Sequence, residues 1–104
     1  MKRAAKACFV YILKNFKPKK ILVLCGLGNN GGDGIITHYY LNYYGVNSEL
    51  LLFNSQQKQS WIFDKYPIND QSIQLYDKTY SFDPQYWYVD GIFGIGLKRN
   101  VEGI

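Results

Sequence analysis

Residues 21–34 read ILVLCGLGNNGGDG, and this stretch decides the fold. Its first five residues are all apolar, with no polar alternation, which is typical of a parallel strand buried on both faces. Its second part holds five glycines, and glycine lets a backbone turn tightly and approach a ligand closely. A strand that runs through a glycine loop into a helix predicts an α/β domain with a ligand site at the carboxyl end of the strand.

The rest of the chain alternates between helix and strand patterns. Apolar residues at helical spacing predict an amphipathic helix over 2–16, which Pro18 ends. Asp33 is expected to cap a second helix that runs to Tyr44 and ends at Gly45. The remaining expected elements are strands at 48–54, 73–76 and 87–93 and a weaker helix at 56–66. This order predicts an α/β fold, a Rossmann-like three-layer αβα sandwich with a mostly parallel sheet, incomplete at the C-terminus.

Size and composition favour one small domain. The chain has 104 residues, 47% of them apolar, which supports a packed core and argues against disorder. The net charge is +4, and seven of the twelve Lys and Arg residues lie in residues 1–20, where there is no acid. We interpret this basic end as the solvated face of the first helix, in preference to a nucleic-acid or membrane contact.

Targeting signals and cysteine chemistry are read from the same sequence. No apolar run approaches the roughly 20 residues of a membrane span, and no small-residue cleavage site follows the first helix. We therefore expect a cytoplasmic protein with no membrane contact, while a mitochondrial location stays open. Cys8 and Cys25 fit no metal or redox spacing and are expected to be reduced core thiols.

The first glycine loop satisfies G-x-G-x-x-G through Gly26, Gly28 and Gly31. On its own this pattern is a weak signal of dinucleotide binding. The acid that a nicotinamide dehydrogenase needs about 20 residues further on is missing, which disfavours that class. Asp33 also stands where a diphosphate would exclude a carboxylate. A carboxylate at this position is better suited to capping a helix or to binding a ribose hydroxyl or a cation.

A second glycine loop follows the last expected strand, in residues 89–100, VDGIFGIGLKRN. Lys98 and Arg99 suit a diphosphate. If the two strands are neighbours, both loops open on one crevice, where Asp90 and an amide oxygen of Asn29 or Asn30 could share a hard cation. A turn or cap acid is an equally good interpretation of Asp90.

Two long motifs now bear a resemblance to a known family. Residues 23–41, VLCGLGNNGGDGIITHYYL, resemble the first signature of the YjeF N-terminal domain family, the NAD(P)H-hydrate epimerases. Residues 89–103, VDGIFGIGLKRNVEG, resemble the second. The resemblance implies that residues 1–104 are a partial domain of this kind. It also implies an isomerase that interconverts the R and S forms of hydrated NADH and NADPH (NADHX and NADPHX), which repairs a damaged nicotinamide cofactor.

The resemblance further implies a homodimer, one K⁺ per subunit and a functional partnership with an NAD(P)H-hydrate dehydratase. It implies K⁺ ligation by Asn30 and Asp90, and it places the expected catalytic Asp beyond Ile104, so that the catalytic residue is unknown. The substrate contacts that it implies are Asn29, Asn30, Gly31, Gly32, Asp33, Gly94, Ile95, Gly96, Leu97, Lys98, Arg99 and Asn100. The alternatives are a non-catalytic nucleotide-binding or RNA-associated scaffolding module of the same fold, or an inactive fragment.

Overall fold

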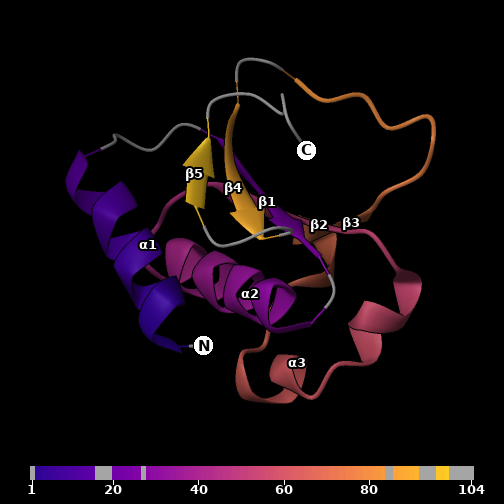
Figure 1. Ribbon diagram of the computed structural model, residues 1–104, viewed down its shortest axis with the longest axis horizontal. Coiled ribbons are helices and arrows are strands. Elements are labelled where there is room, and N and C mark those ends of the chain that lie inside the picture. The colour runs from indigo at the N-terminus through magenta and orange to yellow at the C-terminus, as the bar shows by residue number, and fades with distance from the viewer. Residues whose placement is uncertain (1, 16–19, 27, 84–85, 92–95, 99–104) are drawn as a thin grey trace.

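A computed structural model of the chain describes residues 2–15, 20–26, 28–83, 86–91 and 96–98 (Figure 1). Helices and strands alternate along most of this chain. The helical elements are α1 (Lys2–Asn15), α2 (Gly28–Tyr43), α3 (Ile62–Lys65) and the 3-10 turns η1 (Ser55–Gln59) and η2 (Asp70–Ser72). The strands are β1 (Ile21–Cys25), β2 (Ser48–Leu52), β3 (Ile73–Leu75), β4 (Trp87–Gly91) and β5 (Gly96–Lys98). Within the described ranges, no helix has the length and apolarity needed to cross a membrane.

The strands form one sheet in the order β3-β2-β1-β4-β5. The first four are parallel and β5 runs antiparallel to β4. This confirms the predicted α/β fold with a mostly parallel sheet. The order reverses at β1, because the chain first adds β2 and β3 on one side and then β4 on the other. In open α/β sheets, ligands bind beyond the carboxyl ends of the strands at such a reversal.

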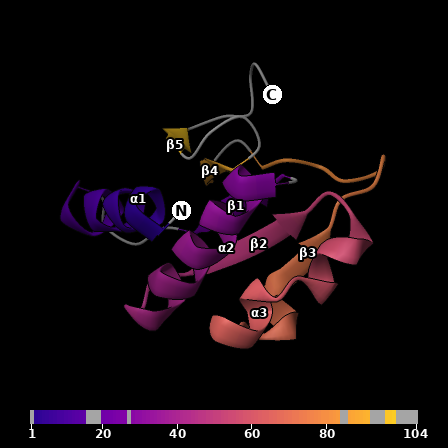
Figure 2. The ribbon, with the colours of Figure 1, turned by 60° about the horizontal axis from the view of Figure 1, so that its bottom comes forward.

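All three α-helices pack on one face of the sheet. Alternate strand residues point to this face, among them Ile21, Val23 and Cys25 of β1. They share one apolar cluster with buried residues of α1, α2 and α3. Figures 1 and 2 show α2 lying along the sheet between α1 and α3. The helices therefore cover this face and leave the strand ends open at its edge.

Aromatic side chains cover the opposite face. Leu22, Leu24, Leu51 and Tyr88 form a second buried cluster there. Phe53, Tyr80, Phe82 and Tyr86 pack against it, so that Tyr and Phe from the segment between β3 and β4 close this side of the core. The third layer of the predicted sandwich is thus, over the described residues, an aromatic segment.

The expected helix at 2–16 and the expected strands at β1, β2, β3 and β4 are confirmed within one or two residues. The helix after the glycine loop is longer than expected. It begins at Gly28, so the prediction that Asp33 caps it is wrong. Further along the helix, a Cβ built on Gly34 would lie 3.4 Å from Val23 Cγ1, so α2 packs closely on β1 at this position.

The carboxyl end of α2 is as predicted. Gly45 has a φ of +84°, which glycine adopts without the strain that a side chain would add. Its N–H donates to the Asn42 carbonyl (3.1 Å), and the N–H of Val46 donates to the Leu41 carbonyl (2.9 Å). This pair of bonds is the Schellman motif, which satisfies the last carbonyls of a helix.

Two other expectations need correction. The weak helix at 56–66 is divided at Ser60 into η1 and α3. The second glycine loop is shorter than expected, because Gly96–Lys98 form β5, in which Gly96 pairs with Asp90 and Lys98 with Tyr88. The local sequence of β5 gives no strand signal, and its pairing with β4 decides the conformation.

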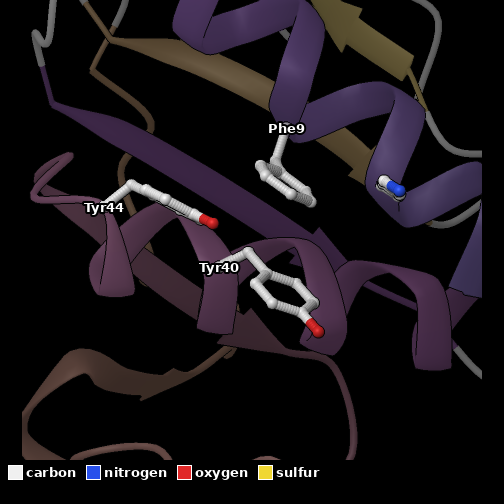
Figure 3. Close-up of a pocket in the computed structure, with 4 residues that line it drawn as sticks. Phe9, Tyr40 and Tyr44 are labelled. Atoms are coloured by element: carbon white, nitrogen blue, oxygen red, sulfur yellow. The ribbon is translucent and has the colours of Figure 1, made fainter.

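An aromatic seam joins α1 to α2. The Phe9 ring stacks on the Tyr40 ring at 4.8 Å and on the Tyr44 ring at 5.7 Å between centroids. Figure 3 shows Phe9 reaching from α1 toward Tyr40 of α2 and Tyr44, which directly follows α2. A hollow of about 250 Å³ opens here, lined by these three rings and Lys6. The seam uses the amphipathic face of α1 to hold that helix on α2.

Candidate functional site

The carboxyl ends of β1 and β4 lie side by side. Cys25 at the end of β1 pairs in register with Gly91 at the end of β4, and Leu24 pairs with Asp90. Just beyond, the N–H of Gly26 donates to the Gly91 carbonyl at 3.0 Å. The start of the first glycine loop and Asp90 therefore lie together at the carboxyl ends of these two strands, which we call the β1–β4 edge. The sequence predicted this arrangement if the two strands were neighbours.

Asp33 is the most unusual group at this edge. Its side chain belongs to α2 and only 7% of its surface is exposed. One of its carboxylate oxygens, Oδ1, is buried with no hydrogen-bond partner among the described residues. Burial raises the pKa of this carboxyl above its usual value. Burying an unpaired polar atom destabilises a fold, so this carboxylate is suited to a partner that the described part of the chain does not supply.

Asp90 is also buried, with 3% of its surface exposed. Because it pairs with Leu24 and follows Val89, strand alternation places it on the aromatic face, while Asp33 comes from the helix face. Gly34, next to Asp33, packs over β1 close to Cys25. The structure thus brings two carboxylates to the same end of β1 from opposite faces of the sheet.

The other predicted site residues fall into two groups. The first group, Asn29, Asn30, Gly31 and Gly32, forms part of α2 near its start and not a loop. In the second group, Gly96, Leu97 and Lys98 form β5 beside Asp90, while Gly94, Ile95, Arg99 and Asn100 lie outside the described residues. Predicted residues from both motifs therefore flank the β1–β4 edge.

The start of α2 favours an anionic group. The first four N–H groups of a helix have no partner within it, and the aligned peptide dipoles add a partial positive charge. At 16 residues, α2 is a full-length helix, and it begins next to the β1–β4 edge. Backbone N–H groups at such a position suit the diphosphate of a dinucleotide.

The donor set at the edge is oxygen-based. A hard monovalent cation prefers carboxylate and carbonyl oxygens, and Asp33 and Asp90 supply the first kind. Over the described part of the chain, no three His, Cys, Asp or Glu side chains come together as a transition-metal site would require. The edge therefore fits a cation held by few carboxylates and by backbone or amide oxygens better than it fits zinc.

One residue that sequence reasoning missed is Gln57 of η1. Its side-chain amide donates to the carbonyls of Gly26 (2.7 Å) and Cys25 (3.1 Å). The pattern Asn54-x-x-Gln57 is a sequence signal for a capping box, and that box is present. The contact to the glycine loop spans 31 residues of chain and has no local signal.

His38 is structural. It is fully buried, and its ring nitrogens bond the hydroxyls of Ser48 (2.7 Å) and Ser72 (3.0 Å) and the side-chain amide of Asn42 (3.2 Å). Burial lowers the pKa of His38 to about 4, so the ring is neutral near pH 7. The network ties α2 to β2 and η2. These protein partners occupy both ring nitrogens, which argues against contact with a ligand.

Both cysteines are thiols. Burial raises the pKa of Cys25 to about 12 and that of Cys8 to about 11. Thiolate, the reactive form, is therefore scarce at neutral pH. This confirms the expectation of reduced thiols in the core.

Comparison with known proteins shows the family. The profile of a family described as YjeF-related protein N-terminus matches residues 1–104. The chain is 36% identical to an NAD(P)H-hydrate epimerase of Oenococcus oeni over 99% of this chain and 51% of that protein. It is 32% identical to an NAD(P)H-hydrate epimerase of Entamoeba histolytica over 83% of this chain and 38% of that protein.

A longer protein is also similar. The bifunctional NAD(P)H-hydrate repair enzyme Nnr of Dictyoglomus turgidum is 31% identical over 98% of this chain and 21% of its own length. The chain spans about half the length, or less, of these curated relatives. The matched part includes both glycine-rich motifs, so the similarity covers the whole of the β1–β4 edge.

Proposed function

This chain belongs to the YjeF-related protein N-terminus family, and we propose that it serves in the epimerisation of hydrated NADH and NADPH. The reaction interconverts the R and S forms of NADHX and NADPHX and so supports repair of the nicotinamide cofactor. Asp33 carries the proposal, since it is a buried acid near the start of α2 with an oxygen that has no hydrogen-bond partner among the residues the structure describes. A hydrated nicotinamide nucleotide is rich in hydroxyl groups, which can donate hydrogen bonds to such an oxygen.

The two motifs divide the substrate between them in this proposal. The start of α2 supplies Asp33 and backbone N–H groups, which suit a hydroxyl and a phosphate respectively. The residues after β4 supply positive charge for the diphosphate through Lys98 and Arg99. The full set proposed to contact substrate is Asn29, Asn30, Gly31, Gly32, Asp33, Gly94, Ile95, Gly96, Leu97, Lys98, Arg99 and Asn100.

One K⁺ per subunit is part of the proposal. Asn30 and Asp90 would hold it, with backbone carbonyls completing the oxygen shell. Support comes from the buried Asp90 at the carboxyl end of β4 and from the oxygen-based donor set at that edge. A bound cation would supply positive charge that orients the substrate's polar groups. The chain's own residues would bind the rest of the substrate. Asp33 would accept a hydrogen bond from a hydroxyl group, and the N–H groups at the start of α2 would bind the phosphate.

Epimerisation at the hydrated carbon requires a proton to be given and taken as the hydroxyl leaves and returns. We assign no catalytic residue within residues 1–104. Asp33 is kept as a substrate-binding group and Asp90 as a cation ligand. The two carboxylates lie on opposite faces of the sheet, which suits two separate tasks.

The wider setting is proposed on the same basis. We further propose a Rossmann-like domain, a homodimer and a cytoplasmic location; the mostly parallel sheet with its reversal at β1 supports the first of these. A functional partnership with an NAD(P)H-hydrate dehydratase is supported by the printed name of the Dictyoglomus turgidum relative, which is a bifunctional repair enzyme. Hydrated NAD(P)H is the proposed small-molecule partner.

An epimer-exchange time course tests this proposal. A single epimer of hydrated NADH is mixed with the purified chain and K⁺, and both epimers are followed by chromatography against a no-protein control. Exchange that is faster with the wild-type chain, slower with Asp33→Asn and unchanged with Asp64→Asn, an exposed acid on α3, would mean that residues 1–104 suffice for epimerisation with Asp33 as a substrate-binding group. Exchange at the no-protein rate would reject catalysis by this chain, and a binding titration would then separate a nucleotide-binding module from an inactive fragment.

A further inference from the structure

The turn that follows β2 reaches across the sheet to the start of the glycine loop. Its residue Gln57 lies in η1, and the side-chain Nε2 donates to the carbonyl of Gly26 at 2.7 Å and to that of Cys25 at 3.1 Å. Both acceptors belong to buried residues. One side-chain amide group therefore bonds the last residue of β1 and the first residue after it.

The Gln57 side chain is itself held in place. Its Oε1 accepts a hydrogen bond from the Asn54 backbone N–H at 2.8 Å. In return, Asn54 Oδ1 caps η1 by accepting from the Gln56 N–H at 2.9 Å. Both polar atoms of the Gln57 side-chain amide thus have a partner. The capping box holds the amide in the orientation in which it bonds the loop.

Gly26 is bonded from both sides. Its N–H donates to the Gly91 carbonyl of β4 at 3.0 Å, and its carbonyl accepts from Gln57. The ends of β2, β1 and β4 are therefore linked through this one residue. Two residues further on, α2 begins, the helix that carries Asp33. A shift of Gly26 would move the start of α2 relative to Asp90.

We propose that Gln57 is a positioning residue of the nucleotide site. Gln57 positions the site by fixing the Gly26 carbonyl and, through it, the start of α2. It acts through the loop and touches no reacting atom. The proposal rests on the proposed function for its kinetic effect, whereas its structural effect can be measured with no ligand present.

A capping role alone is the competing explanation, and substitutions separate the two. Gln57→Glu keeps the acceptor for the Asn54 N–H, since glutamate is a regular member of a capping box, but it removes both donors and faces two carbonyl oxygens with a carboxylate. Gln57→Lys keeps a donor for those carbonyls and loses the acceptor. Gln56→Glu is the matched control, because it makes the same change on an exposed neighbour.

Amide hydrogen exchange of the intact chain reads the structural effect. For Gln57→Glu we expect exchange at the Gly26 N–H to accelerate about tenfold or more, while the core amide of Leu51 changes by less than about twofold. Gln57→Lys and Gln56→Glu should leave Gly26 near its wild-type rate. An unchanged Gly26 rate in Gln57→Glu overturns the proposal. Equal acceleration at Gly26 and Leu51 also overturns it, because that result means a loss of global stability.

Kinetics read the functional effect. In the epimer-exchange assay, Gln57→Glu should raise KM for hydrated NADH about tenfold, and Gln57→Lys should recover most of it. A KM for Gln57→Glu equal to that of Gln56→Glu would overturn the role in the site. If the wild-type chain shows no exchange activity, the proposed function fails, while the hydrogen-exchange result still decides whether Gln57 holds the loop.

Discussion

Replacing Asp33 with asparagine should stabilise the protein and weaken its ligand binding. The carboxylate is 7% exposed, and its Oδ1 has no hydrogen-bond partner in the described part of the chain. An acceptor buried in this way costs about 1–3 kcal/mol, and a charged one costs more. Asparagine removes the charge but leaves a polar atom in place. We therefore expect a gain of about 1 kcal/mol in the free energy of unfolding, or roughly 4–8 °C in Tm for a domain of this size.

The stability difference should depend on pH in a fixed direction. Burial raises the pKa of Asp33 in the folded state above its unfolded value. The stability contributed by this carboxyl is therefore fully present below the unfolded pKa and is lost as pH rises through the folded pKa. Asparagine does not titrate. The advantage of Asp33→Asn over wild type should thus be largest at a pH above the folded pKa of Asp33 and should be lost at a pH below its unfolded pKa.

Urea unfolding followed by far-ultraviolet circular dichroism measures the stability change at both pH values. Asp64→Asn, the exposed control, should shift the free energy of unfolding by less than about 0.5 kcal/mol. Affinity for hydrated NADH should fall about tenfold or more in Asp33→Asn, since a hydrogen bond to a charged group is lost. A destabilised Asp33→Asn with unchanged affinity would refute the reasoning, because the Asp33 carboxylate would then stabilise the fold and not bind the ligand.

Three further perturbations test the fold that positions the site. The chain has one histidine, so its imidazole NMR signal is unambiguous. His38 should titrate near pH 4. The free energy of unfolding should fall by about 3 kcal/mol as pH falls from about 6.5, the unfolded pKa of histidine, to about 4, because the unfolded state takes up the proton first. A midpoint near the unfolded value would contradict the buried network. Gly45→Ala should lower the free energy of unfolding, measured by a thermal melt, by about 1 kcal/mol, because a residue with a side chain is strained at a φ of +84°. Gly45→Asn should lower it by less. Equal effects would show that the Schellman geometry is not needed. Gly34→Val should cost about 1–3 kcal/mol, because its added carbons would press on Val23 and Leu24, whereas Gly34→Ala adds one carbon at contact distance. Equal Tm values for the two would mean that α2 does not pack closely on β1.

The core elements could be predicted because their signals are local. The apolar run of β1 and the helical spacing of Phe9 and Ile12 in α1 report burial directly, and the structure confirms both elements. Gly45 was predicted as the end of α2 because few other residues adopt its φ. The meeting of the first loop with Asp90 followed from the rule that parallel strands end at one edge.

The errors arose where tertiary packing overrides local preference. Asn and Gly are poor helix formers, so residues 28–32 were expected to form a loop, yet they form the first turns of α2. β5 has no strand composition of its own and exists through its pairing with β4. Gln57 was missed because its contact to Gly26 joins segments 31 residues apart.

A binding footprint tests the central claim, that the β1–β4 edge is the nucleotide site, most directly. The isotope-labelled chain is titrated with hydrated NADH in K⁺ buffer, and backbone amide shifts are mapped residue by residue. The largest shifts should fall on Gly26, Asp33 and Asp90, and the Asp33→Asn variant should weaken them. Shifts centred instead on the α1–α2 seam at Phe9 and Tyr44, or unaffected by Asp33→Asn, would contradict the account.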